Sequence, residues 1–200
     1  MKTLDVILNF LIFIITAVIV FRFSRKDGRW APDKARIAFR FFTCQSNALC
    51  AAVSLLAALA QLSGELPRWA WTLKYIGTAS VAVTMFTVFL YLWPLIGKEG
   101  PKHLLSGPDC FMHLVTPLLA VLSFCLLEKQ GMSFPECLWG MLPVALYGPH
   151  YLYRIRLAPE GKRWEDFYSF NQGGKWPLSF AMMFAGTFLL CLLFLLAQNA

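Results

Sequence analysis

Six apolar stretches of about 20 residues occupy most of this chain and constrain its fold more than any other feature. The hydrocarbon core of a bilayer is about 30 Å thick, and a helix of about 20 residues crosses it. Only 14% of the 200 residues are charged, whereas a soluble domain carries about 25%. The sequence therefore predicts an all-α fold, a polytopic membrane helical bundle of six transmembrane helices. We expect a single transmembrane domain over residues 1–200, with spans at about 4–23, 38–62, 72–95, 110–127, 136–153 and 177–197.

The basic residues are unevenly distributed among the loops. The net charge is +7, and 14 of the 18 lysine and arginine residues lie in or beside the first, third and fifth loops. Such an excess marks the cytoplasmic side of a membrane protein, so we expect these loops in the cytoplasm and both termini outside. The pattern explains the positive charge without a nucleic-acid partner. The first span is too long for a signal-peptide core and is expected to remain as an anchor.

Metal chemistry and disulfide bonds are not predicted. The six cysteines include no C-x-x-C pair, and the three histidines have no spacing typical of metal ligands. Four cysteines fall within apolar stretches, where a thiol behaves as a small buried side chain. We therefore expect no metal and no cofactor.

The stretch from Phe41 to Cys50 carries polar residues where lipid favours leucine. A polar group in hydrocarbon costs on the order of several kcal/mol unless it finds a partner. At helical spacing, five side chains share one face, which must point at other helices or at a wet cavity. They are Thr43, Ser46, Asn47, Cys50 and Ser54. A second polar row, on the third span, is expected to serve helix packing, because hydroxyls in membrane helices commonly bond back to their own backbone.

The predicted topology places several polar side chains at one depth. Spans two and four enter the membrane from the cytoplasmic side, and spans three and five leave on that side. If the helices cluster, polar residues near that boundary can line one pocket that faces the cytoplasm. These residues are Thr43, Asn47, Tyr91, His113, Tyr147 and His150.

Such a pocket favours nucleophilic chemistry. A threonine hydroxyl becomes a nucleophile when a base takes its proton, and a neutral histidine is the usual base, so we pair Thr43 with His113. Asp109 lies one helical turn before His113, in a position to orient it. The alternative is structural, because a helical threonine usually bonds its own backbone and a lone histidine is most often a satisfied polar contact. The substrate-binding or oxyanion candidates are Gln45, Ser46, Asn47, Tyr91, Asp109, Tyr147 and His150.

Two short motifs carry a resemblance to a known family. Residues Phe41 to Asn47 read aromatic-aromatic-Thr-x-x-x-Asn, and His113 to Pro117 read His-x-x-x-Pro two spans later. In these motifs, and loosely over all six spans, the chain resembles the androgen-induced and androgen-dependent membrane threonine hydrolases. The aromatic segment from Trp164 to Trp176 looks more like that of uncharacterised bacterial members.

Characterised members of that family cleave fatty-acid esters of hydroxy fatty acids with an intramembrane threonine and histidine. The resemblance implies that Thr43 is the nucleophile, that His113 is its base and that the substrate is a membrane lipid or lipid-like ester. It also implies a bacterial inner membrane. Two other classes remain open, a transporter or binding protein for a small amphiphile and a non-catalytic membrane scaffold. No pair of broken spans at matching positions favours a transporter. The aromatic loop 154–176 is expected to lie on the membrane or to fold back over the helix ends.

Overall fold

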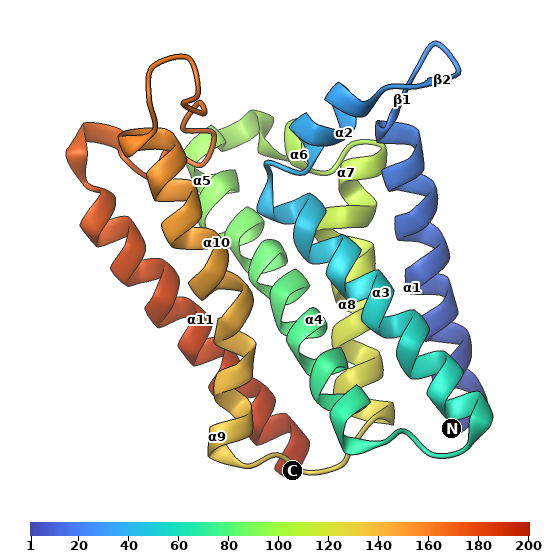
Figure 1. The fold of residues 1–200 in the computed structure, drawn as a ribbon. Helices are drawn as coiled ribbons and strands as arrows, with labels where there is room; N and C mark the ends of the chain where they lie inside the picture. Colours follow the sequence, from blue (N-terminus) through green and yellow to red (C-terminus); the bar gives the residue numbers. More distant parts are fainter.

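The computed structural model describes residues 1–200, which form a bundle of helices that run from end to end in six passes (Figure 1). Three passes are single helices, α1 (Lys2–Phe23), α3 (Phe42–Ser63) and α11 (Trp176–Asn199). The third pass consists of α4 (Arg68–Thr87), η1 (Val88–Leu92) and α5 (Trp93–Ile96). The fourth consists of α7 (Pro108–Cys110), η3 (Phe111–Val115), α8 (Thr116–Leu122) and η4 (Ser123–Leu127). The fifth consists of α9 (Phe134–Cys137), η5 (Leu138–Met141), α10 (Leu142–Leu152) and η6 (Tyr153–Leu157).

The prediction of an all-α membrane bundle is confirmed. Five helical runs are long and apolar enough to cross a membrane. The remaining pass, residues 134–157, changes its helical type several times and contains Gly140, Pro143 and Pro149. Proline removes a backbone donor and glycine weakens a helix, which explains why this pass is not one continuous α-helix. The chain is therefore an integral membrane protein built as a helical bundle.

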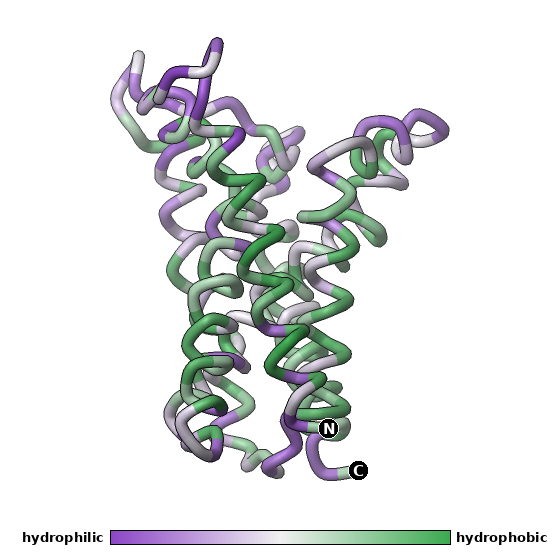
Figure 2. Tube along the Cα trace, turned by 90° about the vertical axis from the view of Figure 1, so that its right-hand side faces the viewer, coloured by the Kyte–Doolittle hydropathy of each residue, from purple (hydrophilic) through white to green (hydrophobic).

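Both termini lie at one end of the bundle, and the first, third and fifth loops lie at the other (Figure 1). Hydrophilic segments gather at the loop-bearing end, whereas the middle of the bundle is mainly hydrophobic (Figure 2). This arrangement brings the most basic loops together at one end, which we call the loop end. Its short elements are β1 (Arg25–Lys26), β2 (Arg29–Trp30), α2 (Pro32–Ala38), η2 (Gly97–Glu99), α6 (Gly100–Leu104) and η7 (Gln172–Gly174).

The first loop contains a small hairpin that we did not predict. Strands β1 and β2 are antiparallel, with Arg25 opposite Trp30. The two residues between the strands, Asp27 and Gly28, have φ values of 50° and 78°. Two consecutive positive φ values are typical of a tight hairpin turn, and Asp-Gly is a preferred sequence for it. The hairpin extends the loop end beyond the last turn of α1.

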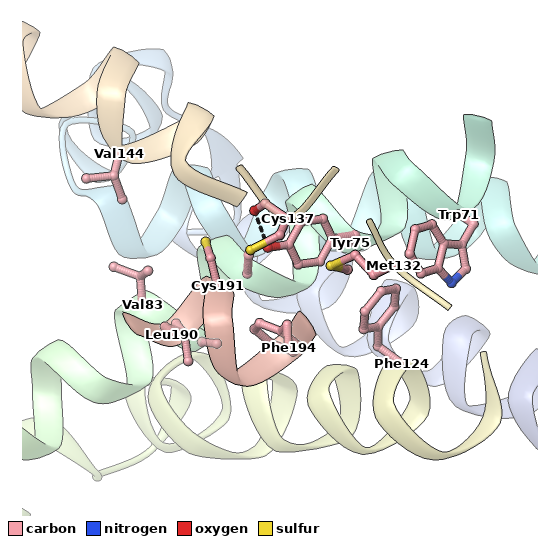
Figure 3. Packing of buried hydrophobic residues seen from close by; sticks show 12 residues of the cluster. Trp71, Tyr75, Val83, Phe124, Met132, Cys137, Val144, Leu190, Cys191 and Phe194 are labelled. Atoms are coloured by element: carbon pink, nitrogen blue, oxygen red, sulfur yellow. Dashed lines mark hydrogen bonds between the residues drawn. The ribbon is translucent and has the colours of Figure 1, made fainter. Parts of the chain in front are cut away.

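Helix α4 lies at the centre of the bundle and is the most extensively buried. Its Trp71 and Tyr75 pack against Phe124 from η4 and Phe194 from α11 (Figure 3). The Tyr75 hydroxyl donates to the Cys137 carbonyl at 2.7 Å, so this apolar cluster also satisfies its one buried phenol. The cluster joins α4 to the fourth, fifth and sixth passes.

Small residues allow α3 to approach α4 on the other side. Ala57 and Ala58 of α3 are fully buried, as are Ala79 and Ala82 of α4. A Cβ atom on Gly77 would lie 2.5 Å from Val53 Cγ2. In membranes, close helix approach through small residues replaces the hydrophobic driving force that is available in water. This packing fixes the position of α3, which carries the candidate nucleophile.

Candidate functional site

The candidate site lies where α2 gives way to α3, at the loop end (Figure 1). We predicted a second span that is helical from residue 38. Instead, residues 39–41 form a turn, and α3 begins at Phe42. Thr43 is therefore the second residue of α3 rather than a residue more than one turn inside a helix. The first N–H groups of a helix have no acceptor within it and carry the positive end of its dipole, so Thr43 lies at that positive end.

Two of the predicted site residues hold this turn. Gln45 Nε2 donates to the Phe39 carbonyl at 2.8 Å, and the Tyr147 hydroxyl donates to the Arg40 carbonyl at 2.7 Å. The interruption of the helix leaves both carbonyls without their usual backbone donors, and these side chains replace them. The structure thus gives Gln45 and Tyr147 a positioning role at the start of α3.

A tyrosine from the last loop completes the start of α3. The residue before the helix, Phe41, offers no capping side chain, and the Phe42 N–H donates to the Tyr168 hydroxyl oxygen at 2.9 Å. Burial raises the pKa of Tyr168 to about 12, and the hydrogen bond from the Phe42 N–H offsets part of the rise. The phenol therefore keeps its proton near neutral pH. It accepts from the helix and retains an O–H to donate.

Asp166 holds the loop that carries Tyr168. Its Oδ1 accepts from the Tyr151 hydroxyl and from the Phe170 N–H, both at 2.9 Å. Its Oδ2 accepts from the Asn171 N–H at 2.7 Å. One carboxylate thereby satisfies a phenol of α10 and two backbone donors of the loop. Of the two arrangements that we expected for this segment, the structure has the one in which it folds back over the helix ends.

A cavity of about 560 Å³ lies beside Thr43 and His113, and Asp109 also lines it. Three basic side chains, Arg22, Arg25 and Lys34, form part of its wall. The structure thus brings the predicted nucleophile, the predicted base and the neighbouring carboxylate around one hollow. No hydrogen bond joins Thr43 to His113 in the unliganded protein. Catalytic hydrogen bonds often tighten only when substrate is bound.

The orientation of His113 is set by a backbone carbonyl. His113 Nδ1 lies 2.6 Å from the Leu104 carbonyl oxygen at the end of α6. We predicted that Asp109 would orient this ring, but Asp109 makes no hydrogen bond to it, and the Leu104 carbonyl takes that part. A carbonyl oxygen only accepts, so Nδ1 carries the hydrogen and the neutral ring has its free lone pair on Nε2.

Asn47 is committed to structure. Its Nδ2 donates to the Thr43 carbonyl at 2.9 Å and to the Met112 carbonyl at 3.0 Å, which uses both amide hydrogens. The Met112 carbonyl lies in the wide turn η3, where its donor would be the N–H five residues later. That residue is Pro117, which has no N–H, and Asn47 takes its place. The predicted role of Asn47 as an oxyanion donor is therefore not supported by its contacts, which instead tie α3 to the turn that bears His113.

The remaining predicted residues lie away from this cavity. A second hollow of about 310 Å³ lies between α3 and α10, and its lining includes Gln45, Ser46, Tyr147 and His150. The Ser46 hydroxyl is also within 2.8 Å of the Thr84 hydroxyl, so the two predicted polar rows meet between α3 and α4.

His150 and Tyr91 contact the last loop. The His150 ring meets the Trp164 ring edge-on, with centroids 5.3 Å apart. The Tyr91 hydroxyl donates to the Ser169 carbonyl at 3.4 Å. The single pocket that we predicted is therefore two hollows on different faces of α3, with Tyr91 beside the loop that covers them.

Sequence reasoning missed two residues of the site, Leu104 and Tyr168. Leu104 acts through its backbone oxygen, so its side chain carried no signal. Tyr168 stands in an aromatic loop that drew attention as a whole, without a reason to single out one phenol. No family model, curated protein or solved structure matches the chain. The roles of Thr43 and His113 therefore rest on these contacts and on the resemblance of their motifs.

Proposed function

We propose that this chain is an intramembrane hydrolase of lipid esters, with Thr43 as nucleophile and His113 as general base. The observation that carries the proposal is the contact between His113 Nδ1 and the Leu104 carbonyl at 2.6 Å. It leaves the Nε2 lone pair free on the wall of a cavity that Thr43 also lines. An imidazole in that tautomer can accept the proton of a hydroxyl nucleophile.

In the proposed reaction, the ester carbonyl lies between Thr43 and His113. Thr43 Oγ1 attacks the carbonyl carbon while His113 Nε2 takes the hydroxyl proton. The bond to the alcohol oxygen then breaks, that oxygen receives the proton from Nε2, and the acyl group remains on Thr43. A water molecule next gives a proton to Nε2 and attacks the acyl carbon. The fatty acid leaves and Oγ1 regains its proton, so that ester and water become acid and alcohol.

The developing oxyanion is best stabilised at the start of α3. The N–H groups of the first helical turn point toward that end, and the helix dipole favours negative charge there. The Tyr168 O–H is a further donor beside the same turn, because its oxygen already accepts from Phe42. Preorganised donors of this kind are usually the largest single contribution to acyl transfer.

A lipid ester suits this cavity because its walls combine apolar and basic side chains. Phe23, Ile37 and Met112 offer apolar contact, whereas Arg22 and Lys34 add positive charge. By the resemblance of the motifs, fatty-acid esters of hydroxy fatty acids are the first substrates to assay. We further propose that the loop end faces the cytoplasm of a bacterial cell and that both termini face outward, as the basic loops indicate.

Covalent labelling tests the proposal. The purified protein should react with a fluorophosphonate probe, which is attacked by an activated hydroxyl, and Thr43→Ala and His113→Gln should lose the adduct. Thr43→Ser should keep it, because the hydroxyl remains. Mass spectrometry of the labelled peptide should place the adduct on residue 43.

Matched controls exclude a general effect of substitution. Thr72→Ala removes a threonine from the opposite end of the bundle, and His150→Gln removes an imidazole that lines the other hollow. Both should label like the parent protein. Equal labelling of Thr43→Ala and the parent, or no hydrolysis of any ester in a panel by the parent, would refute the hydrolase. Saturable binding of an amphiphile without turnover would then identify a binding protein or transporter.

A further inference from the structure

A second polar cluster lies at the opposite end of the bundle, near the chain termini, and plays no part in the proposed reaction. Three ionisable side chains are buried there, Asp5 of α1 (1% exposed), Lys74 of α4 (0%) and Glu128 (3%), which directly follows η4. Ionisable residues inside a membrane bundle are rare and usually serve a function. We call the residues of this group the buried charge cluster; it also includes Asn9, Ser54, Gln61 and Ser123.

Lys74 is the only cation within the cluster. Its Nζ donates to Asn9 Oδ1 at 2.6 Å and to Ser54 Oγ at 2.8 Å, and it lies 3.9 Å from Glu128 Oε1. The ammonium group thus occupies the position where a metal cation would find its oxygen ligands. One positive charge faces two carboxyl groups. If both carboxyls were ionised, the cluster would carry a net negative charge without water, which is strongly unfavourable.

The hydrogen bonds of Ser123 show how this charge is avoided. Ser123 Oγ lies 2.5 Å from Asp5 Oδ1 and 2.9 Å from Glu128 Oε1. A hydroxyl has one hydrogen, so it donates to only one of these two oxygens. The other contact requires a hydrogen that the carboxyl group supplies. A chain from one carboxyl O–H through Ser123 to the other carboxylate satisfies both distances.

The amide donors do not change this count. Asn9 Nδ2 is shared between Glu128 Oε1 at 2.8 Å and Asp5, and Gln61 Nε2 donates to Asp5 Oδ2 at 2.5 Å. Glu128 Oε2 is buried and has no partner. A second full negative charge in the cluster would leave this acceptor unsatisfied in a dry environment, which the native state of a protein rarely tolerates.

We propose that Asp5 and Glu128 hold one proton between them through Ser123, which makes the buried charge cluster a proton-binding site within the membrane bundle. With Lys74 charged, one shared proton brings the cluster to neutrality. The other titratable groups near it do not alter that balance, since Cys50 is a buried thiol and the exposed Lys129 lies in solvent. The proton can pass in either direction along the same three oxygens, because each is within hydrogen-bond distance of the next.

Infrared spectroscopy tests this proposal directly. A protonated carboxyl group gives a carbonyl stretching band above the amide bands that shifts in heavy water, whereas a carboxylate gives none there. The parent protein in lipid should show such a band at neutral pH, and isotope-labelled aspartate and glutamate should assign it to this pair. This measurement needs no variant and is independent of ester hydrolysis.

Substitutions then count the protons. In Asp5→Asn or Glu128→Gln the remaining carboxyl faces Lys74 alone and should ionise, so the band should disappear. In Lys74→Met both carboxyls lose their cation and should be protonated, so the band should grow about twofold. Glu65→Gln, which changes an exposed carboxylate, should leave the band unchanged. Absence of the band from the parent protein, or its persistence in both the Asp5 and Glu128 variants, would overturn the proposal.

Discussion

The close approach of α3 and α4 yields a prediction whose magnitude follows from the coordinates. A Cβ atom on Gly77 would lie 2.5 Å from Val53 Cγ2 and 3.1 Å from the Cα atom of Cys50. The first neighbour is a stiff β-branched side chain and the second is backbone, so neither can move without shifting α3. Gly77→Ala should therefore cost about 1–3 kcal/mol through overpacking. It should also gain about 1 kcal/mol from the better helix propensity of alanine.

Gly186 in α11 provides the matched control. No atom lies within 4 Å of the place that its Cβ would take, so Gly186→Ala should show only the propensity gain of about 1 kcal/mol. That gain is common to both variants, and their difference in unfolding free energy isolates the contact between α3 and α4, at about 1–3 kcal/mol. Both variants can be unfolded by titration with sodium dodecyl sulfate in mixed micelles, followed by far-ultraviolet circular dichroism. If Gly77→Ala proves as stable as Gly186→Ala, α3 and α4 are not packed as closely as described.

Three further substitutions test separate parts of the molecule. Tyr168→Phe removes the acceptor of the Phe42 N–H, so α3 should lose about 1 kcal/mol, the usual cost of losing a helix cap, and fluorophosphonate labelling should slow. Asp109→Asn should change the labelling rate far less than the roughly 10²–10⁴-fold that loss of a general base costs, because the carbonyl of Leu104 already orients the imidazole. Lys74→Met should lower the free energy of unfolding by about 3–5 kcal/mol in the same detergent titration, since it strips a buried cation from its partners.

The six passes could be predicted because bilayer thickness fixes the length of an apolar helix. The start of α3 could not, because it depends on contacts between distant segments. Gln45 and Tyr147 supply the donors that make a turn at residues 39–41 acceptable, and Tyr147 is 107 residues from the carbonyl that it satisfies. The hairpin at Asp27 and Gly28 did carry a local signal, but we read that loop for its charge alone.

The candidate site was only partly predictable because depth in the membrane is one coordinate of three. Thr43 and His113 share both a depth and a cavity, whereas Ser46 and His150 share the depth but line another face of α3. Lys74 was counted with the loop charges because it stands near the start of a span. Its burial depends on partners from three other passes, and no single stretch of sequence reveals them.

The bond between Phe42 and Tyr168 also bears on biosynthesis. The acceptor follows the donor by 126 positions, so a growing chain has inserted five of its six passes before the phenol emerges to complete the beginning of α3. A polypeptide interrupted earlier has a nucleophile and a base but an unfinished helix start. The order of synthesis thus keeps an unfinished chain from acting on the lipids that surround it while it is being made.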